Sequence, residues 1–309
     1  MADQNRERKI KVGILFGGRS GEHEVSLRSA ASVMAALDRE KYEVVPIGIT
    51  KNGRWLTGDA MAALTSGSDA SHPATLLPDP QSTALLQLSN GEADSPTLST
   101  VTELDVIFPV LHGTYGEDGT VQGLLELANI PYVGAGVVGS AVGMDKAIFK
   151  SVMAAHGIPI LPWRLYTRRS VVHELDKVVA DVAANLDYPV FTKPANLGSS
   201  VGIQKCSDQD ELRAGLAEAA RYDRRVVVEQ GINVRELEVS VLGNDDPIAS
   251  VVGEIRPRRA FYDYVAKYLT EPGSDEDSEL IIPAHIEPEL AERVRALAVR
   301  AYRAIDCAG

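Results

Sequence analysis

One βαβ pattern near the start of the chain constrains the fold more than any other feature. The apolar, β-branched runs "IKVGILF" (10–16) and "YEVVPIGI" (42–49) both predict buried strands. Between them, apolar residues recur at helical spacing: Leu27, Ala30, Ala31, Met34 and Leu37. Two such strands joined by a helix form a right-handed crossover. The chain is therefore predicted to contain a parallel sheet.

The first predicted region, 1–140, continues this α/β pattern. Another strand is expected at 105–111, followed by a helix. Residues 57–100 are rich in Ser, Thr, Pro, Gly and Ala and show no firm periodicity, so we expect a long insertion there.

Two further regions are predicted, at 141–230 and 231–309. The former begins near Asp145, a possible helix N-cap, and alternates helices with short strands. That alternation indicates α+β packing, with helices on one face of a small antiparallel sheet. The latter holds two strands, at 236–243 and 248–255, and a final helix that begins near Pro288.

Composition excludes several classes of protein. The chain has 309 residues with 31 basic and 43 acidic side chains, a net charge of -12, which argues against a nucleic-acid partner or an anionic membrane. The two cysteines, Cys206 and Cys307, give neither a disulfide framework nor a metal or redox C-x-x-C spacing. We find no signal peptide and no apolar run long enough to span a bilayer, and we expect a cytoplasmic protein.

The stretch "TKPANLGSSVGI" (192–203) admits two interpretations. Its G-x-S-x-G string resembles a hydrolase nucleophile elbow, whereas its glycines, serines and Lys193 suit a loop that binds phosphate; it is not a Walker A motif. An elbow leads into a helix, but the alternation from Ser200 continues as a strand until a helix N-cap at Ser207 or Asp208. The turn thus joins two strands, and phosphate binding or a plain Gly-Ser hairpin remains.

Two segments of the first region follow strands and carry titratable groups. "GGRSGEHEVS" (17–26) includes Glu22, and "LHGTYGEDG" (111–119) includes His112. Carboxyl ends of parallel strands meet at one edge, where ligands bind in open α/β sheets. The alternatives are that Glu22 only stabilises a helix N-terminus and that His112 is structural. The glycines at 13–21 do not form a dinucleotide-binding G-x-G-x-x-G motif.

A tyrosine-rich stretch lies in the third region. "FYDYVAKYL" (261–269) falls in a loop expected at 256–280, and its aromatics show neither a helical nor a strand period. Such a loop can close as a lid that excludes water, although a packing loop is the alternative.

Over essentially its whole length the chain resembles the D-alanine–D-alanine ligases of the ATP-grasp superfamily. The matching motifs, in order, are "FGGRSGEHEVSL", "HGTYGEDGTVQG", "MDK", "TKPANLGSSVG", "VEQ…RELEVSVLG" and "FYDYVAKY". The resemblance implies an ATP-grasp fold behind a Rossmann-like N-terminal domain. It also implies ATP-dependent joining of two D-alanines through a D-alanyl phosphate, for peptidoglycan precursor synthesis.

The same resemblance implies roles for particular residues. Glu22, His112 and Tyr262 would bind D-alanine, and Glu22, Ser199 and Tyr268 would act in catalysis. ATP would be held by Lys146, Lys193, Ser199, Ser200, Val201, Glu229, Ile232, Glu236 and Lys267. A variant that makes D-alanyl-D-lactate usually replaces the pair at 267 and 268, so this chain favours an amine acceptor.

One departure from the family concerns metal. The resemblance implies Mg²⁺ or Mn²⁺, whose ligands would lie in strands beyond residue 309, so we expect a truncated C-terminal domain and little activity of this chain itself. The alternatives are another ATP-grasp carboxylate–amine ligase, or a nucleotide-binding module without catalysis. The resemblance also makes a homodimer possible.

Overall fold

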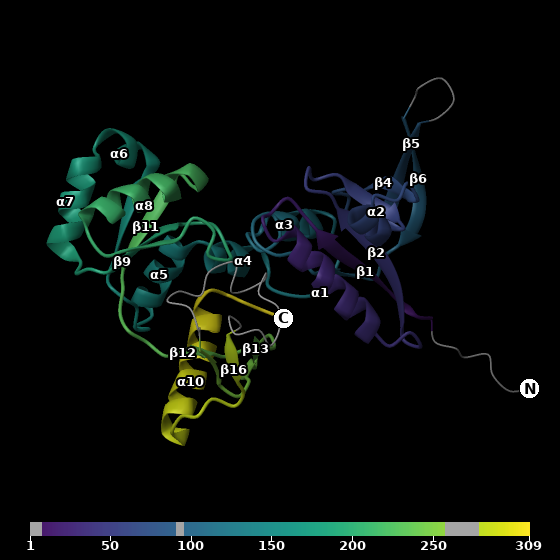
Figure 1. Ribbon diagram of the computed structural model, residues 1–309. Helices are drawn as coiled ribbons and strands as arrows, with labels where there is room; N and C mark the ends of the chain where they lie inside the picture. Colours follow the sequence, from purple (N-terminus) through teal and green to yellow (C-terminus); the bar gives the residue numbers. More distant parts are fainter. Residues whose placement is uncertain (1–7, 91–95, 257–277) are drawn as a thin grey trace, which may run out of the picture. The chain divides into compact units, whose positions relative to one another are not determined.

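The computed structural model describes residues 8–90, 96–256 and 278–309 (Figure 1). It divides into two compact units, residues 1–137 and 138–309. Each unit has its own sheets and its own core, and each is described by itself.

The first unit contains a seven-stranded sheet in the order β6-β5-β4-β3-β2-β1-β7. Strand β1 (Ile10–Gly17) lies parallel to β2 (Tyr42–Ile49) and to β7 (Val106–Pro109). Helix α1 (His23–Ala36) connects the first two of these strands. The predicted βαβ unit and its parallel sheet are therefore confirmed.

The sequence showed no firm periodicity in 57–100, but the structure places regular elements there. An antiparallel ladder extends the sheet through β3 (Trp55–Gly58), β4 (Ser71–Leu76), β5 (Ala84–Asn90) and β6 (Pro96–Glu103), with the short helix α2 (Ala60–Ser66) after β3. The segment expected as a long insertion therefore consists largely of regular elements that extend the sheet. Strand β6 is almost wholly exposed and therefore needs few apolar residues, so it carries little of the hydrophobic alternation that marks a strand.

Both faces of the parallel strands are covered. Alternate residues of β1 point in opposite directions, so Ile14 and Phe16 pack with Leu27 of α1, whereas Leu15 packs on the other side with Leu125 of α3 (Thr120–Leu127). Burial on both faces explains why β1 reads as a continuous apolar run. The parallel pairing of β1 with β7 places their carboxyl ends at one edge of the sheet.

The second unit contains a four-stranded antiparallel sheet in the order β10-β9-β11-β8. Its strands are β8 (Trp163–Thr167), β9 (Val190–Pro194), β10 (Gln204–Cys206) and β11 (Arg225–Gln230). Helices α6 (Arg168–His173), α7 (Leu175–Asn185) and α8 (Gln209–Tyr222) share one apolar core with these strands. The predicted antiparallel sheet with packed helices is confirmed. Glu174, whose φ of -136° is not helical, separates α6 from α7.

The rest of the second unit is built from short elements. They are α4 (Val137–Met144), α5 (Lys146–Ala155), the sheet of β12 (Glu236–Glu238), β15 (Gly253–Arg256) and β16 (Glu279–Ile281), the pair β13 (Val241–Leu242) and β14 (Ile248–Ala249), and α10 (Pro288–Ala304). Each strand expected here as one piece is broken in two, near Ser240 and near Ser250. Ser250 N–H donates to the Ser240 carbonyl at 2.9 Å, whereas Ser240 N–H donates to the Ser250 hydroxyl at 3.1 Å. The helix start at Pro288 is confirmed.

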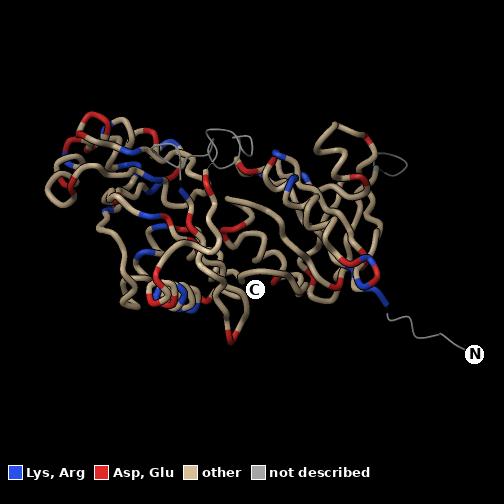
Figure 2. The backbone as a smooth tube through the Cα atoms, turned by 60° about the horizontal axis from the view of Figure 1, so that its bottom comes forward, with Lys and Arg blue, Asp and Glu red and all other residues tan. Residues whose placement is uncertain are grey.

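Charge is mixed in both units. Figure 2 shows Lys and Arg positions beside Asp and Glu positions in each of them. No helix within the described ranges is long and apolar enough to cross a membrane.

Candidate functional site

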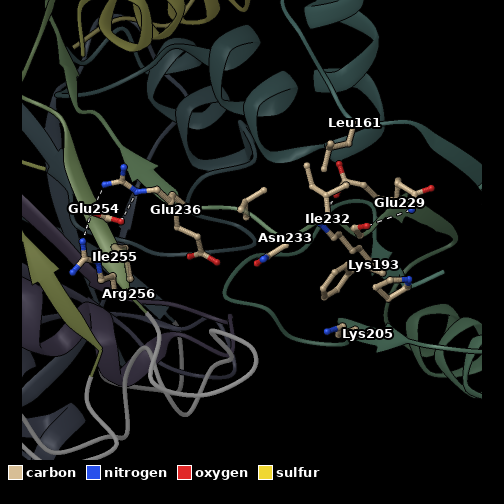
Figure 3. Close-up of a pocket in the computed structure, with 16 residues that line it drawn as sticks. Leu161, Lys193, Lys205, Glu229, Ile232, Asn233, Glu236, Glu254, Ile255 and Arg256 are labelled. Atoms are coloured by element: carbon tan, nitrogen blue, oxygen red, sulfur yellow. Dashed lines mark hydrogen bonds and ion pairs between the residues drawn. The ribbon is translucent and has the colours of Figure 1, made fainter. Parts of the chain in front are cut away.

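A pocket of about 800 Å³ lies in the second unit (Figure 3). Strands β9, β11 and β15 and the segment 231–236 supply its walls. Its polar lining residues are Lys193, Lys205, Glu229, Gln230, Asn233, Arg235, Glu236, Glu254 and Arg256. Figure 3 shows Lys193 and Glu229 at one end and Glu254 and Arg256 at the other. The pocket therefore offers fixed charges at two separate places.

Strand pairing determines the first charged end. Glu229 of β11 is directly opposite Phe191 of β9, and Lys193 is two residues further along β9. Residues two apart in a strand share a face, so these three side chains project to the same side of the sheet. The Lys193 ammonium forms an ion pair with Glu229 and lies 5.6 Å from the centre of the Phe191 ring.

A second lysine reaches the same carboxylate. Lys150 of α5 pairs with Glu229 Oε1, while Lys193 pairs with Oε2. Burial by itself raises the pKa of Glu229, but Lys193 and Lys150 outweigh that effect and the net pKa lies below the ordinary 4.5. Glu229 is thus an anion held between two cations.

The second charged end was not predicted from the sequence. Arg235 donates from Nε and Nη2 to the two carboxylate oxygens of Glu254 at 2.8 and 2.7 Å, and Arg256 Nη2 donates to Oε2 at 3.2 Å. Bonds from Arg235, above all, lower the pKa of Glu254 to about 2. The sequence signal that could have indicated this end is the alternation of Arg and Glu in "RELE" and "GEIR". The two strands that contain these motifs pair antiparallel.

The loop between β9 and β10 has the conformation of a tight turn. Ser199 and Ser200 have φ values of +49° and +59°, and the N–H groups of Val201 and Ile203 donate to carbonyls three residues earlier at 3.2 Å. The loop joins two antiparallel strands, which excludes a nucleophile elbow there. Strand β10 begins only at Gln204, later than expected, because the preceding residues form these turns.

Lys146 lies beside that loop. Its backbone N–H donates to the Ala195 carbonyl at 2.9 Å, and its ammonium donates to the Leu197 carbonyl. Asp145 caps α5, as expected, by accepting from Ala147 and Ile148 N–H, and it also pairs with Arg225. The start of α5 is therefore bonded to the segment just after β9 and to the first residue of β11.

The predicted nucleotide-binding residues fall into three groups. Lys193, Glu229, Ile232 and Glu236 line the pocket. Lys146, Ser199, Ser200 and Val201 are outside its lining, at the start of α5 and in the adjoining loop. Lys267 lies outside the described residues, as do Tyr262 and Tyr268, which were predicted for substrate binding and for catalysis.

In the first unit the two predicted segments meet. Glu22 is 6% exposed and makes no side-chain capping bond to α1, so its carboxylate is not a helix cap. Its Oε2 lies 2.4 Å from the place where a Cβ on Gly113 would be. Gly113 has a φ of +70°, and its N–H donates to Glu117 Oε2 at 2.8 Å. Only glycine lets the backbone come this close to Glu22.

His112 belongs to the same cluster. Its Nε2 is 3.1 Å from the Ser29 hydroxyl and its Nδ1 is 3.8 Å from Glu117 Oε1. Interaction with Glu117, aided by Glu22 and opposed by partial burial, raises the pKa of His112 above 6.5. His112 also lines a pocket of about 220 Å³, at whose wall Arg19 stacks 4.4 Å from the Tyr115 ring centre. The structure thus places His112 close to the carboxylates of Glu22 and Glu117.

Comparison with known proteins finds a family match for an N-terminal and for a C-terminal segment of this chain. Residues 11–135 match the family described as "D-ala D-ala ligase N-terminus", and residues 152–309 match "D-ala D-ala ligase C-terminus". The two matches together cover most of the chain.

Individual relatives and solved structures extend this finding. The chain is 46% identical over 305 residues to the D-alanine–D-alanine ligase of Natranaerobius thermophilus, covering 98% of this chain and 80% of the relative. It is 47% identical over 303 residues to that of Heliobacterium modesticaldum, with 97% and 80% covered. The VanG D-Ala:D-Ser ligase of Enterococcus faecalis superposes with a TM-score of 0.81 at 33% identity, covering 97% and 84%. The chain belongs to the D-alanine–D-alanine ligase family.

Proposed function

We propose that this protein joins two D-alanines at the expense of ATP, supplying D-alanyl-D-alanine for peptidoglycan precursors in the cytoplasm. One observation supports the proposal most: Lys193 and Glu229 lie side by side in the pocket of the second unit, as a cation for phosphate and an anion for the adenine amino group. An ammonium has three N–H donors, so Lys193 can hold phosphate oxygens and Glu229 together.

The remaining nucleotide contacts come from neighbouring segments of the second unit. We propose that Lys146 binds phosphate from the start of α5 and that Ser199, Ser200 and Val201 form the loop that covers it. Ile232 would contact adenine, and Glu236 would accept from the ribose hydroxyls. Lys267 is proposed for the γ-phosphate on the family resemblance alone.

The first unit is proposed to bind the first D-alanine. Glu22 would accept from its ammonium group, and protonated His112 would donate to its carboxylate. Burial of Glu22 strengthens such an ion pair because water screens it less. Tyr262, together with the catalytic roles of Ser199 and Tyr268, remains a proposal from the family.

The chemistry follows from the weakness of a carboxylate as an acyl donor. A carboxylate oxygen of the first D-alanine attacks the γ-phosphorus of ATP, the bond from that phosphorus to ADP breaks, and D-alanyl phosphate forms. The amine of the second D-alanine then attacks the acyl carbon, phosphate leaves with the electron pair of the C–O bond, and the amine loses a proton. Lysines near the phosphates stabilise the charge that develops on the transferred oxygens.

A divalent metal belongs to this chemistry, since it neutralises phosphate charge when bound. Within the described ranges, no three His, Cys, Asp or Glu side chains are placed to hold a metal ion. These residues do not by themselves fit Mg²⁺ or Mn²⁺, so the metal enters no step of the mechanism proposed for them.

The functional regions are proposed as 1–140 for the first substrate, 141–230 for covering the nucleotide, and 231–309 for the remaining nucleotide contacts. The four-stranded sheet within 163–230 and the two smaller sheets within 236–281 support this division.

An acceptor screen tests the proposed reaction. The protein is incubated with ATP, Mg²⁺, D-alanine and a second acceptor, either D-serine or D-lactate, while ADP and the ligated product are measured together. In place of the little activity expected from the sequence, the match to the family over nearly the whole chain leads us to expect ADP release that depends on D-alanine, with D-alanyl-D-alanine as the main product. A main product with another acceptor would correct the substrate, and ATP binding without any product would favour a nucleotide-binding module.

A further inference from the structure

Lys150 has no place in the roles proposed above, yet its position is specific. It lies one turn after Lys146 on α5, with 13% of its side chain exposed, and its ammonium pairs with Glu229 Oε1. It does not line the pocket. A buried ammonium is costly unless it is paired, so this lysine is held there by Glu229.

The charges around Glu229 show what Lys150 changes. The carboxylate is 9% exposed and carries one negative charge, whereas Lys150 and Lys193 together carry two positive charges. Each lysine occupies a different oxygen. Lys150 therefore weakens the electrostatic attraction between Glu229 and Lys193. The group of three has one net positive charge, and two of its members, Lys193 and Glu229, line the pocket, whereas Lys150 does not.

We propose that Lys150 is a positioning residue for nucleotide binding: it holds Glu229 from behind, so that Lys193 remains available to phosphate and the carboxylate keeps its orientation toward the base. This inference rests on the proposed function, because it takes the pocket to be the nucleotide site. Lys150 itself touches no substrate. It acts through Glu229 alone.

Removal of Lys150 would leave Glu229 Oε1 without its cation. The carboxylate can then turn both oxygens toward Lys193, and an ammonium engaged by a whole buried carboxylate is less available to phosphate. The carboxylate also loses the contact that fixes its orientation. It then distinguishes less well between adenine, whose amino group donates a hydrogen bond, and guanine, whose oxygen at the same position does not.

Equilibrium binding of nucleotides to full-length variants tests this inference without relying on turnover. ATP and GTP are titrated calorimetrically into wild type, Lys150→Met and Lys150→Arg in the absence of D-alanine. We expect Lys150→Met to raise the Kd for ATP about tenfold and to narrow the ratio of GTP to ATP Kd values, with Lys150→Arg within about threefold of wild type. Lys177→Met, which removes an exposed lysine paired with Glu174, is the matched control and should bind as wild type does.

A double mutant separates this role from a merely structural one. In a Glu229→Gln background there is no carboxylate charge to share, so adding Lys150→Met should change the ATP Kd less than twofold. An equal loss in both backgrounds would show that Lys150 does not act through Glu229 and would overturn the inference. Circular dichroism checks the fold of each variant, and Lys150→Gln replaces the methionine variant if that one does not fold.

The remaining outcomes distinguish this inference from the proposed function. If wild type binds ATP and Lys150→Met binds it equally well, the inference fails while the proposed function stands. If wild type binds ATP but makes no dipeptide, the proposed ligation reaction is wrong. The Kd values of the variants still decide the role of Lys150 in that case. Absence of ATP binding by wild type would overturn both.

Discussion

The backbone at Gly113 lies against the carboxylate of Glu22, so that a Cβ at residue 113 would fall 2.4 Å from Glu22 Oε2. We predict that Gly113→Ala moves this carboxylate and raises the KM for D-alanine about tenfold or more, with ATP binding unchanged. The φ of +70° adds strain of ~1–2 kcal/mol for any L side chain. Steady-state kinetics with each substrate varied in turn measures the effect.

Gly21→Ala is the control, because a Cβ at residue 21 meets nothing within 4 Å and its φ is not in the positive range that strains side chains. It should keep the wild-type KM. An equal rise in KM for D-alanine in both variants would contradict the role given to the contact between Gly113 and Glu22.

The pair of His112 and Glu117 predicts a pH dependence. Glu117 raises the pKa of His112 in the folded state above its ordinary value of 6.5. The pair therefore stabilises the fold fully at pH values below 6.5, and this contribution is lost as the pH rises through the folded-state pKa. Both side chains are partly exposed, so the effect is under about 1 kcal/mol. The free energy of unfolding of wild type should exceed that of Glu117→Gln by more at pH 6 than at pH 9.

The histidine proton resonances provide an independent check. In Glu117→Gln the His112 pKa should fall toward its ordinary value. A pKa that stays the same or rises would show that the carboxylate is not its cause.

Asp145 stabilises the second unit in two ways that substitution can separate. It caps α5 and it pairs with Arg225, whose side chain is only 19% exposed. Asp145→Ala removes both interactions and should lower the free energy of unfolding by ~3–5 kcal/mol, since it leaves a nearly buried guanidinium unpaired. Asp145→Asn keeps a capping oxygen, so its loss of unfolding free energy should be smaller than that of Asp145→Ala by ~1 kcal/mol. Urea unfolding measures both, and equal losses would rule out the capping contribution.

Two helical glycines should respond oppositely to alanine. A Cβ at Gly123 in α3 meets nothing within 4 Å, so Gly123→Ala should stabilise the protein by ~0.5–1 kcal/mol through helix propensity. A Cβ at Gly215 in α8 would lie 2.6 Å from Thr192 Oγ1 and 2.8 Å from Cys206 Sγ, so Gly215→Ala should destabilise it by ~1–3 kcal/mol. Thermal unfolding of both variants decides this, and stabilisation by the latter would contradict the packing described for α8.

Periodicity was most informative where burial was complete. Strand β1 is buried on both faces, and the sequence located it and its partner β2 correctly. Strand β6 has little buried apolar surface, so its sequence carries no comparable signal. The break near Ser240 depends on a hydroxyl of Ser250, ten residues away, which local patterns do not reveal.

The site was predictable where chemistry concentrates in short motifs. Glu22, His112 and Lys193 stand in such motifs, and the structure places the first two in one cluster and the third in a pocket. Lys150 and Glu254 were missed because each looks like an ordinary surface charge until a partner from a distant segment is known. Their partners are Glu229 and Arg235, contributed by other strands and loops.

Transfer of oxygen from substrate to phosphate tests the central claim most directly. D-alanine labelled with ¹⁸O in its carboxylate is supplied with ATP and Mg²⁺, and mass spectrometry follows the dipeptide, ADP and phosphate together. Formation of D-alanyl phosphate predicts equal amounts of the three products, with one ¹⁸O in each phosphate released. ADP and phosphate without dipeptide, or dipeptide accompanied by unlabelled phosphate, would contradict the account.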